Sequence, residues 1–309
     1  MNLYPSMQIN LFEHKEIFKD LSLLYKNDKL PNKIILSGEK GIGKSTLAYH
    51  LINFILSENE EHPYNYEKNK INSENKSYKL IQNKSNPNFY LIDVAEEKKN
   101  IDINQIRELI INLNKSSFNR KNRFVLIDNI ELLNINSINA LLKILEEPND
   151  NINFILIHNN KKLLPTLKSR CLNFQVFLTK DQSIKIINQI LNDDIYNFIN
   201  HELIDNYITP GRLYKLIKFS EEYNIDFVSL SLNQALKTII KDKIYKKDKS
   251  IIEIIYSFIE LYFRNNISIE NISLLKSYHY FLEKINNTRT YNLDEETLFM
   301  EFEDKILNG

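Results

Sequence analysis

Short apolar runs alternate with stretches of helical spacing over the first half of the chain. A short apolar run between turn residues is typical of a buried strand, whereas apolar residues that recur every three or four positions are typical of a helix. Strands are expected at residues 33–37, 89–92, 123–128, 152–157 and 174–177. Helical spacing marks residues 7–30, 45–56, 102–114 and 136–146. This alternation predicts an α/β fold, in which helices cover both faces of a parallel sheet.

The remainder of the chain has no strand pattern and is predicted to be helical. Thr179 and Gln182 have the spacing of a capping box, which begins a helix. Pro210 and Gly211 interrupt the helical segment that follows. These changes predict three domains, namely an α/β domain over residues 1–178, a small helical domain over 179–222 and a larger helical domain over 223–309.

Charge and cysteine content narrow the classes of function. The chain has 40 Lys and Arg against 40 Asp and Glu, so its net charge gives no indication of nucleic-acid binding, which needs clustered basic residues. No apolar run is long enough to span a membrane, and the first residues do not resemble a signal peptide, so a cytoplasmic protein is expected. A single cysteine, Cys171, excludes an internal disulfide framework and a cysteine-based zinc site.

The strongest motif is the run Gly38-Glu39-Lys40-Gly41-Ile42-Gly43-Lys44-Ser45-Thr46, which satisfies G-x-x-x-x-G-K-[ST] between an expected strand and an expected helix. Glycines let backbone N–H groups turn toward phosphate oxygens, and the following helix N-terminus adds positive potential. Lys44 is expected to reach the β- and γ-phosphates and Ser45 to ligate Mg²⁺. The candidate contacts to ATP or ADP are Gly38, Gly41, Ile42, Gly43, Lys44, Ser45 and Thr46. The alternative is a glycine-rich turn without a ligand.

A carboxylate follows the third expected strand. In phosphate-loop proteins an Asp at this place, here Asp128, helps to hold the Mg²⁺ ion. The alternative is an ordinary Asp that caps a turn at the strand end. Hydrolysing relatives usually have a Glu in the next position, but this chain has Asn129, whose amide cannot accept a proton at neutral pH. Glu131 is the nearest replacement. The site is therefore expected to bind nucleotide and to hydrolyse it poorly.

Three further segments carry longer sequence patterns. Residues 136–148 follow N-A-L-L-K-x-L-E-E-P, residues 163–171 follow L-L-P-T-x-x-S-R-C, and residues 103–109 contain I-R-x-L. These three segments together resemble the AAA+ clamp-loader subunits of bacterial DNA polymerase III. The resemblance covers roughly residues 10–220 in matching order. It implies a phosphate-loop AAA+ domain, a small helical lid and an all-α C-terminal collar that joins subunits into a ring.

The same resemblance assigns roles to two residues. Arg170 matches the arginine finger that reaches the γ-phosphate of ATP in a neighbouring subunit, where a planar and always charged donor suits phosphate. The alternative is an Arg that pairs with a local acidic side chain. Asn159 matches the polar sensor residue at the end of the fourth strand. His158 before it is interpreted as a hydrogen-bonded strand-end histidine.

Departures from the family pattern favour its delta-prime type. Asn129 replaces the catalytic Glu, and Gly211 stands where gamma/tau motor subunits have a sensing Arg, with Arg212 next to it. The resemblance then implies a ring with delta and gamma/tau partners that loads a sliding clamp on primed DNA. The alternatives are a gamma/tau-like motor ATPase and a small-molecule kinase, but a kinase would not explain the motifs at 136–148 and 163–171.

Residues 57–87 are polar and rich in Asn, Lys and Glu, which predicts a loop that is poorly ordered in part. Many members of the resembling family carry a four-cysteine zinc module at this place. No cysteine occurs here, and the six histidines lack ligand spacing and are interpreted as surface or packing residues, so no zinc is expected.

Overall fold

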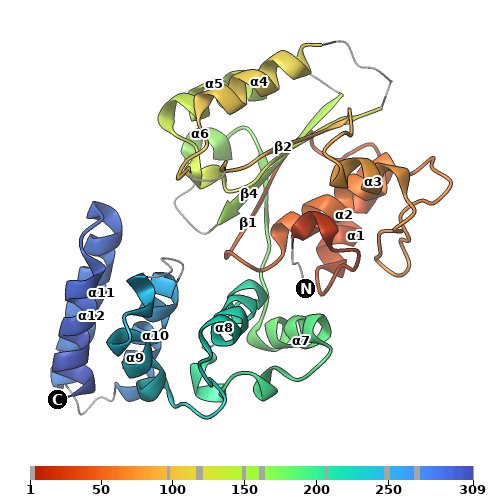
Figure 1. Ribbon diagram of the computed structural model, residues 1–309. Coiled ribbons are helices and arrows are strands. Elements are labelled where there is room, and N and C mark those ends of the chain that lie inside the picture. The colour runs from red at the N-terminus through yellow and green to blue at the C-terminus, as the bar shows by residue number, and fades with distance from the viewer. Residues whose placement is uncertain are drawn as a thin grey trace. The chain divides into compact units, whose positions relative to one another are not determined.

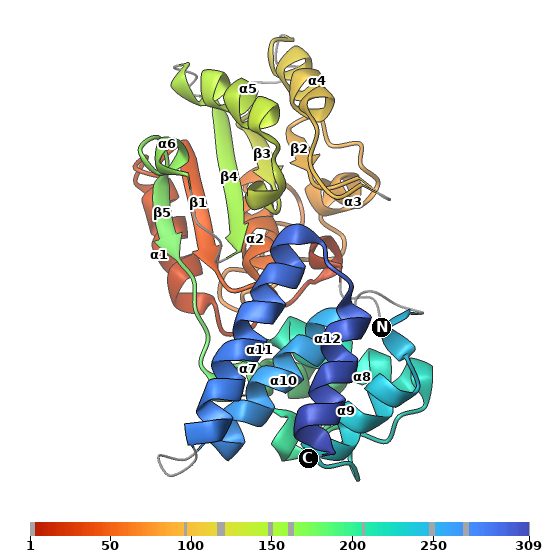
Figure 2. The ribbon, with the colours of Figure 1, turned by 90° about the vertical axis from the view of Figure 1, so that its left-hand side faces the viewer.

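The computed structural model describes residues 4–95, 98–115, 121–147, 151–159, 164–205, 208–246, 251–267 and 272–308. The chain divides into two compact units, Met1–Leu178 and Thr179–Gly309 (Figures 1 and 2). The first unit ends where the strand pattern of the sequence ends. A further division of the helical part at residue 222 stays a prediction.

The first unit contains a sheet of five strands that are all parallel and lie in the order β2-β3-β4-β1-β5 (Figure 2). The strands are β1 Lys33–Gly38, β2 Phe89–Ile92, β3 Arg123–Ile127, β4 Ile152–Asn159 and β5 Leu172–Gln175. The chain passes from β2 to β3 and from β3 to β4 between neighbouring strands, whereas β1 to β2 and β4 to β5 skip over strands that lie between them. Each connection is a crossover, as parallel strands require. The predicted α/β fold with a parallel sheet is confirmed.

Alternating side chains of the central strand β1 supply two cores. Ile34 and Leu36 belong to the core on one face, and Ile35 belongs to the core on the other, each at most 1% exposed. Helices cover both faces, as Figure 1 shows. They are α1 Lys15–Lys26, α2 Lys44–Leu56 and α3 Lys76–Gln82 on one face, and α4 Ile103–Leu113 and α5 Ile135–Glu146 on the other. The short helix α6, Pro165–Lys168, also contributes to the second core.

Two predicted boundaries are wrong. The first helix is shorter than residues 7–30 because Glu13 and Asp28, at its two ends, have left-handed φ angles of 55° and 52° that a helix does not accommodate. The fifth strand begins two residues before 174, at a polar stretch that the apolar pattern does not mark. There the Ser37 hydroxyl donates to the side-chain oxygens of Asn173 and Gln175, at 2.6 and 2.8 Å.

The expectation of a loop over residues 57–87 is wrong at α3. A polar network orders the approach to this helix: Asn75 caps it by accepting from Tyr78 N–H, and its side chain also bonds Asn53 and the His62 carbonyl. A few buried apolar residues, among them Ile71, then attach the segment to the core. No group of three His, Cys, Asp or Glu residues suited to a metal ion occurs in the described ranges.

The elements of the second unit are helices wherever it is described, which confirms the expected helical C-terminal part. They are α7 Lys180–Leu191, α8 Pro210–Tyr223, α9 Leu232–Lys241, α10 Ile252–Asn266, α11 Ile272–Tyr291 and α12 Glu295–Phe302. The capping box of Thr179 and Gln182 begins α7 as predicted. Pro210 begins α8 because its missing N–H is not needed in the first turn. An aromatic cluster around Phe263 and Phe302 packs three of these helices together.

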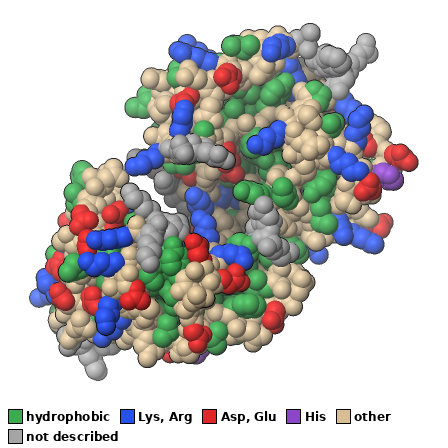
Figure 3. Space-filling model, viewed as in Figure 1, with side chains coloured by type: hydrophobic (Ala, Val, Ile, Leu, Met, Phe, Trp, Pro, Cys, Tyr) green, Lys and Arg blue, Asp and Glu red, His purple; other side chains and the backbone are tan. Residues whose placement is uncertain are grey.

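No helix in the part of the chain that is described has the length and apolar character of a membrane span. On the face drawn in Figure 3, basic and acidic side chains are interspersed, as the zero net charge leads one to expect.

Candidate nucleotide-binding site

The phosphate loop joins β1 to α2, and its glycines are required by geometry. Gly41 and Gly43 have φ angles of 89° and 93°, in the left-handed region that side chains disfavour. A Cβ atom on Gly38 would lie 2.1 Å from the backbone oxygen of Val176, closer than atoms can approach. The loop therefore holds its shape through backbone contacts that only glycine permits, and it leads directly into the first turn of α2.

Lys44 is 3% exposed and is held by the loop itself. Its Nζ donates to the Gly38 carbonyl at 2.8 Å and to the Glu39 carbonyl. Burial lowers the pKa of Lys44 to about 8, although the nearby carboxylates of Asp128, Glu131 and Glu39 oppose that change. A buried lysine with a lowered pKa is ready to gain an anionic partner, since the partner's charge would replace lost solvation.

Ser45 and Asp128 meet beside this lysine. The Ser45 hydroxyl, at the start of α2, donates to Asp128 Oδ2 at 2.6 Å, just beyond the end of β3. Burial raises the pKa of Asp128, and the hydrogen bond from Ser45 opposes that rise. A hydroxyl and a carboxylate next to a phosphate loop form an oxygen set that fits Mg²⁺. The structure thus brings together the two residues that the sequence predicted as ion ligands.

A hydrogen-bonded group of four polar residues occupies the carboxyl edge of β2, β3 and β4. Asn129 Nδ2 donates to Asp93 Oδ1 at 2.9 Å, and Asn159 Nδ2 donates to Asn129 Oδ1 at 2.9 Å. Asn159 also donates to Glu131, from its side chain at 2.8 Å and from its backbone at 3.3 Å. Both Glu131 oxygens therefore accept hydrogen bonds, and the amide of Asn129 is fixed between two partners.

Asp93 was not predicted from the sequence. The signal for it was its position directly after β2, because Ile92 pairs with Ile127 in a parallel ladder and the residues that follow both strands share one edge.

His14 was interpreted as a surface or packing residue, but it lies against the phosphate loop. It is 6% exposed, and its Nε2 donates to the Ile42 carbonyl at 2.5 Å. Burial lowers the pKa of His14, so the ring is neutral with its proton on the nitrogen that faces Ile42. A Cβ on Gly43 would lie 3.4 Å from the same nitrogen. His14 therefore supports the loop from outside, a long-range contact for which the sequence gives no local signal.

Arg170 lies just beyond α6, and its hydrogen bonds to described residues stay within the α/β unit. Its Nε donates to Glu146 Oε1 at 3.0 Å, and its Nη2 forms an ion pair with the same oxygen. Its Nη1 donates to the Thr166 carbonyl at 2.9 Å and to Ser169 Oγ at 3.2 Å. The single chain thus has the local acidic partner that the sequence left open as the alternative, and the trans role of Arg170 stays a prediction. Next to it, Cys171 is buried, and burial raises its pKa to about 11, which suits packing rather than nucleophilic chemistry.

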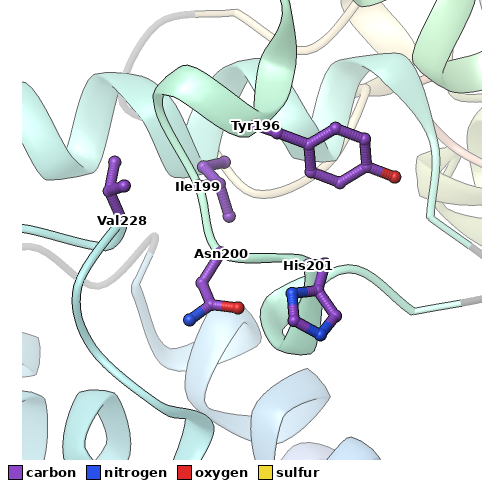
Figure 4. Close-up of a pocket in the computed structure, with 5 residues that line it drawn as sticks. All are labelled: Tyr196, Ile199, Asn200, His201 and Val228. Carbon is purple, nitrogen blue, oxygen red and sulfur yellow. The ribbon is translucent and has the colours of Figure 1, made fainter.

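A shallow hollow of about 400 Å³ in the second unit contains none of these residues. As Figure 4 shows, it is lined by side chains of the segments before α8 and α9, namely Tyr196, Ile199, Asn200, His201 and Val228. One of its polar side chains is already engaged, because Asn200 donates to the Leu230 carbonyl and accepts from Glu202 N–H. The hollow offers no reactive constellation, and the candidate site remains the phosphate loop.

Comparison with known proteins shows several whose sequences are similar to this chain. A curated relative from Buchnera aphidicola, "DNA polymerase III subunit gamma", is 31% identical over 200 residues, which cover 64% of this chain and 50% of that protein. "DNA polymerase III subunit delta'" from Pseudomonas aeruginosa is 32% identical over 138 residues, covering 44% and 40%. The chain therefore spans half or less of the length of these two relatives. A delta' subunit from Buchnera is 25% identical over 289 residues, covering 87% and 83%.

A solved structure of a gamma-subunit-related protein from Thermotoga maritima covers 91% of this chain and 96% of its own, at 18% identity and a TM-score of 0.48. The sequence profile of the family described as "DNA polymerase III, delta subunit" matches residues 13–179, which is more than half of the 309 residues. The resemblance that the motifs indicated is confirmed, and the chain belongs to this family of bacterial DNA polymerase III clamp-loader subunits.

Proposed function

We propose that this chain is a delta-prime-like clamp-loader subunit. It would bind nucleotide, hydrolyse it poorly by itself, and supply Arg170 to ATP in a neighbouring subunit. In a ring with delta and gamma/tau partners, in the cytoplasm, it would help to load a sliding clamp on primed DNA. The observation that carries the proposal is the hydrogen-bonded group of Asn129, Asp93, Asn159 and Glu131, in which an amide follows Asp128 and both Glu131 oxygens already accept hydrogen bonds.

The proposed cofactor is ATP or ADP with Mg²⁺. Lys44 would exchange its two carbonyl partners for phosphate oxygens, and Ser45 and Asp128 would hold the ion. When bound, the ion supplies positive charge beside the phosphate oxygens. Gly41, Ile42 and Gly43 would contribute backbone N–H groups. Asn159 lies at the end of β4, next to this edge, where its amide can respond to the terminal phosphate.

Poor hydrolysis follows from the groups around the attacking water. Asn129 cannot take its proton, and both carboxylate oxygens of Glu131 already accept hydrogen bonds from Asn159. In the second unit, Gly211 lies in the first turn of α8 and has no side chain, and the Arg212 side chain is exposed. The two positions where a motor subunit would carry a catalytic Glu and a sensing Arg are therefore an amide, Asn129, and a glycine, Gly211. The nearby carboxylate of Glu131 is already hydrogen-bonded.

We expect the isolated chain to bind ATP and to release phosphate from it no faster than the Lys44→Ala variant does. The measurement is phosphate release under single-turnover conditions, with nucleotide binding measured in parallel to show that the site is filled. Rapid release that Lys44→Ala abolishes would contradict delta-prime character.

Nucleotide binding is also expected to take up a proton at alkaline pH. In the free chain Lys44 loses its proton near pH 8, whereas bound phosphates raise its pKa again and require the charged form. Affinity should therefore fall as the pH rises from about 7.5 to about 9.5, and binding should absorb a proton in that window. Calorimetry in two buffers of different ionisation enthalpy measures the uptake.

The control for this experiment is Lys40→Met, which removes an exposed lysine of the same loop and should keep both effects. An affinity that does not change over this range, without proton uptake, would show that Lys44 stays fully charged in the free chain.

The second candidate is a gamma/tau-like motor, which the match to a gamma subunit favours. It requires a working base near Asp128. Fast turnover by the isolated chain, lost in a Glu131→Gln variant, would select it.

A further inference from the structure

The contacts of Arg170 leave little of its side chain free to bind phosphate. A guanidinium has five N–H donors. Four of them point at partners in the same chain, two at Glu146 Oε1 and one each at the Thr166 carbonyl and Ser169 Oγ. Forked recognition of a phosphate needs two parallel donors. Arg170 in this arrangement therefore cannot make such a fork without leaving a partner.

Glu146 is the partner whose position helix stability does not explain. It is the last residue of α5, where the partial negative charge of the helix C-terminus disfavours a carboxylate. The ion pair with Arg170 offsets that cost. The side chains are 32% exposed for Arg170 and 55% for Glu146, so water screens the pair and it is weak enough to open and close.

We propose that Glu146 is a positioning residue that holds the Arg170 guanidinium against its own subunit until a neighbouring phosphate competes for it. This inference rests on the proposed function, because it requires Arg170 to act on ATP in another subunit. The finger is then in two states, folded on Glu146 or extended to phosphate, and Glu146 sets the balance between them. A ligand that binds only the extended state loses apparent affinity in proportion to the folded population.

The next residue supplies a matched control. Glu147 carries the same charge and is exposed, but it has the extended backbone of a helix C-cap and no hydrogen bond joins it to Arg170 in the described structure. Glu146→Gln and Glu147→Gln therefore remove the same charge from neighbouring positions, and only the first weakens the hold on Arg170.

The experiment measures DNA-stimulated ATP hydrolysis by a ring reconstituted with the full chain and its delta and gamma/tau partners, as a function of ATP concentration. We expect Glu146→Gln to lower the half-saturating ATP concentration by roughly two- to five-fold, the range of an exposed ion pair. The maximal rate should stay the same, because the extended state is unchanged. Glu147→Gln should leave the half-saturating ATP concentration at the native value. Glu146→Asp, which keeps the charge, should give a value closer to the native one than Glu146→Gln does.

A role through Arg170 also predicts that Glu146→Gln has no effect in an Arg170→Ala background. The inference is overturned if Glu146→Gln raises the half-saturating ATP concentration or lowers the maximal rate. It is also overturned if Glu146→Gln changes the half-saturating ATP concentration no more than Glu147→Gln does. If Arg170→Ala reduces hydrolysis while Glu146→Gln is silent, only the inference fails. If Arg170→Ala itself is silent, the proposed function fails and the inference falls with it. Thermal unfolding of each isolated variant establishes that these surface changes leave the fold intact.

Discussion

A ring that contains Arg170→Ala is expected to hydrolyse ATP roughly 10³-fold more slowly at the site beside this subunit, while it still assembles on its partners. The reason is electrostatic. As the terminal phosphoryl group departs, charge develops on its oxygens, and the extended guanidinium stabilises that charge more than it stabilises the ground state. Loss of the finger should therefore appear mainly in the maximal rate. Single-turnover hydrolysis with primed DNA and clamp measures it.

Lys168→Ala is the matched control for this experiment. It removes an equal charge from an exposed position two residues earlier, on α6, and should leave hydrolysis near the native rate. Gel filtration of each ring separates catalysis from assembly. A normal rate with Arg170→Ala in an intact ring would contradict the trans role and leave the local pair with Glu146 as the function of this arginine.

Lys44→Ala is expected to weaken ATP and ADP binding by the isolated chain roughly 10- to 100-fold, as the loss of a charged hydrogen-bond donor to phosphate predicts. The substitution removes the buried positive charge of the loop and leaves the Gly38 and Glu39 carbonyls without its Nζ. Equilibrium titration with a fluorescent nucleotide measures the change.

The control is Lys40→Ala, which alters an exposed lysine of the same loop and should bind nucleotide almost normally. Because Lys44 is buried, thermal unfolding of the free variant must show that it is folded before its affinity is compared. Equal affinity of a folded Lys44→Ala variant and the native chain would mean that the loop carries no phosphate.

The sheet and the ion-binding pair could be predicted because their signals are local. Four of the strands are apolar runs, which indicate a strand without any knowledge of their tertiary partners. The phosphate-loop motif fixes the number of residues between β1 and α2. Ser45 and Asp128 then meet because residues that follow parallel strands share an edge. The fifth strand was misplaced because its polar side chains find their partner, Ser37, far away in the sequence.

The rest of the site depends on contacts between distant residues. The partner of His14 is Ile42, 28 residues away, and the partner of Asp93 is Asn129, 36 residues away. The acidic partner of Arg170 lies 24 residues earlier in the chain, and many acidic residues stood at comparable distances. The pattern and spacing of residues identify secondary-structure elements and motifs. Hydrogen-bond partners that are distant in the sequence can be identified only from the tertiary structure.

The phosphate loop has a consequence for the speed of binding. Its left-handed glycines, the support from His14 and the tether of Lys44 keep the loop ordered in the free chain. An incoming nucleotide therefore exchanges one set of hydrogen bonds for another and does not have to fold a mobile segment first. Association should then be limited by diffusion and charge, with a single kinetic phase. Differences in affinity between ATP and ADP would appear in how long each stays bound.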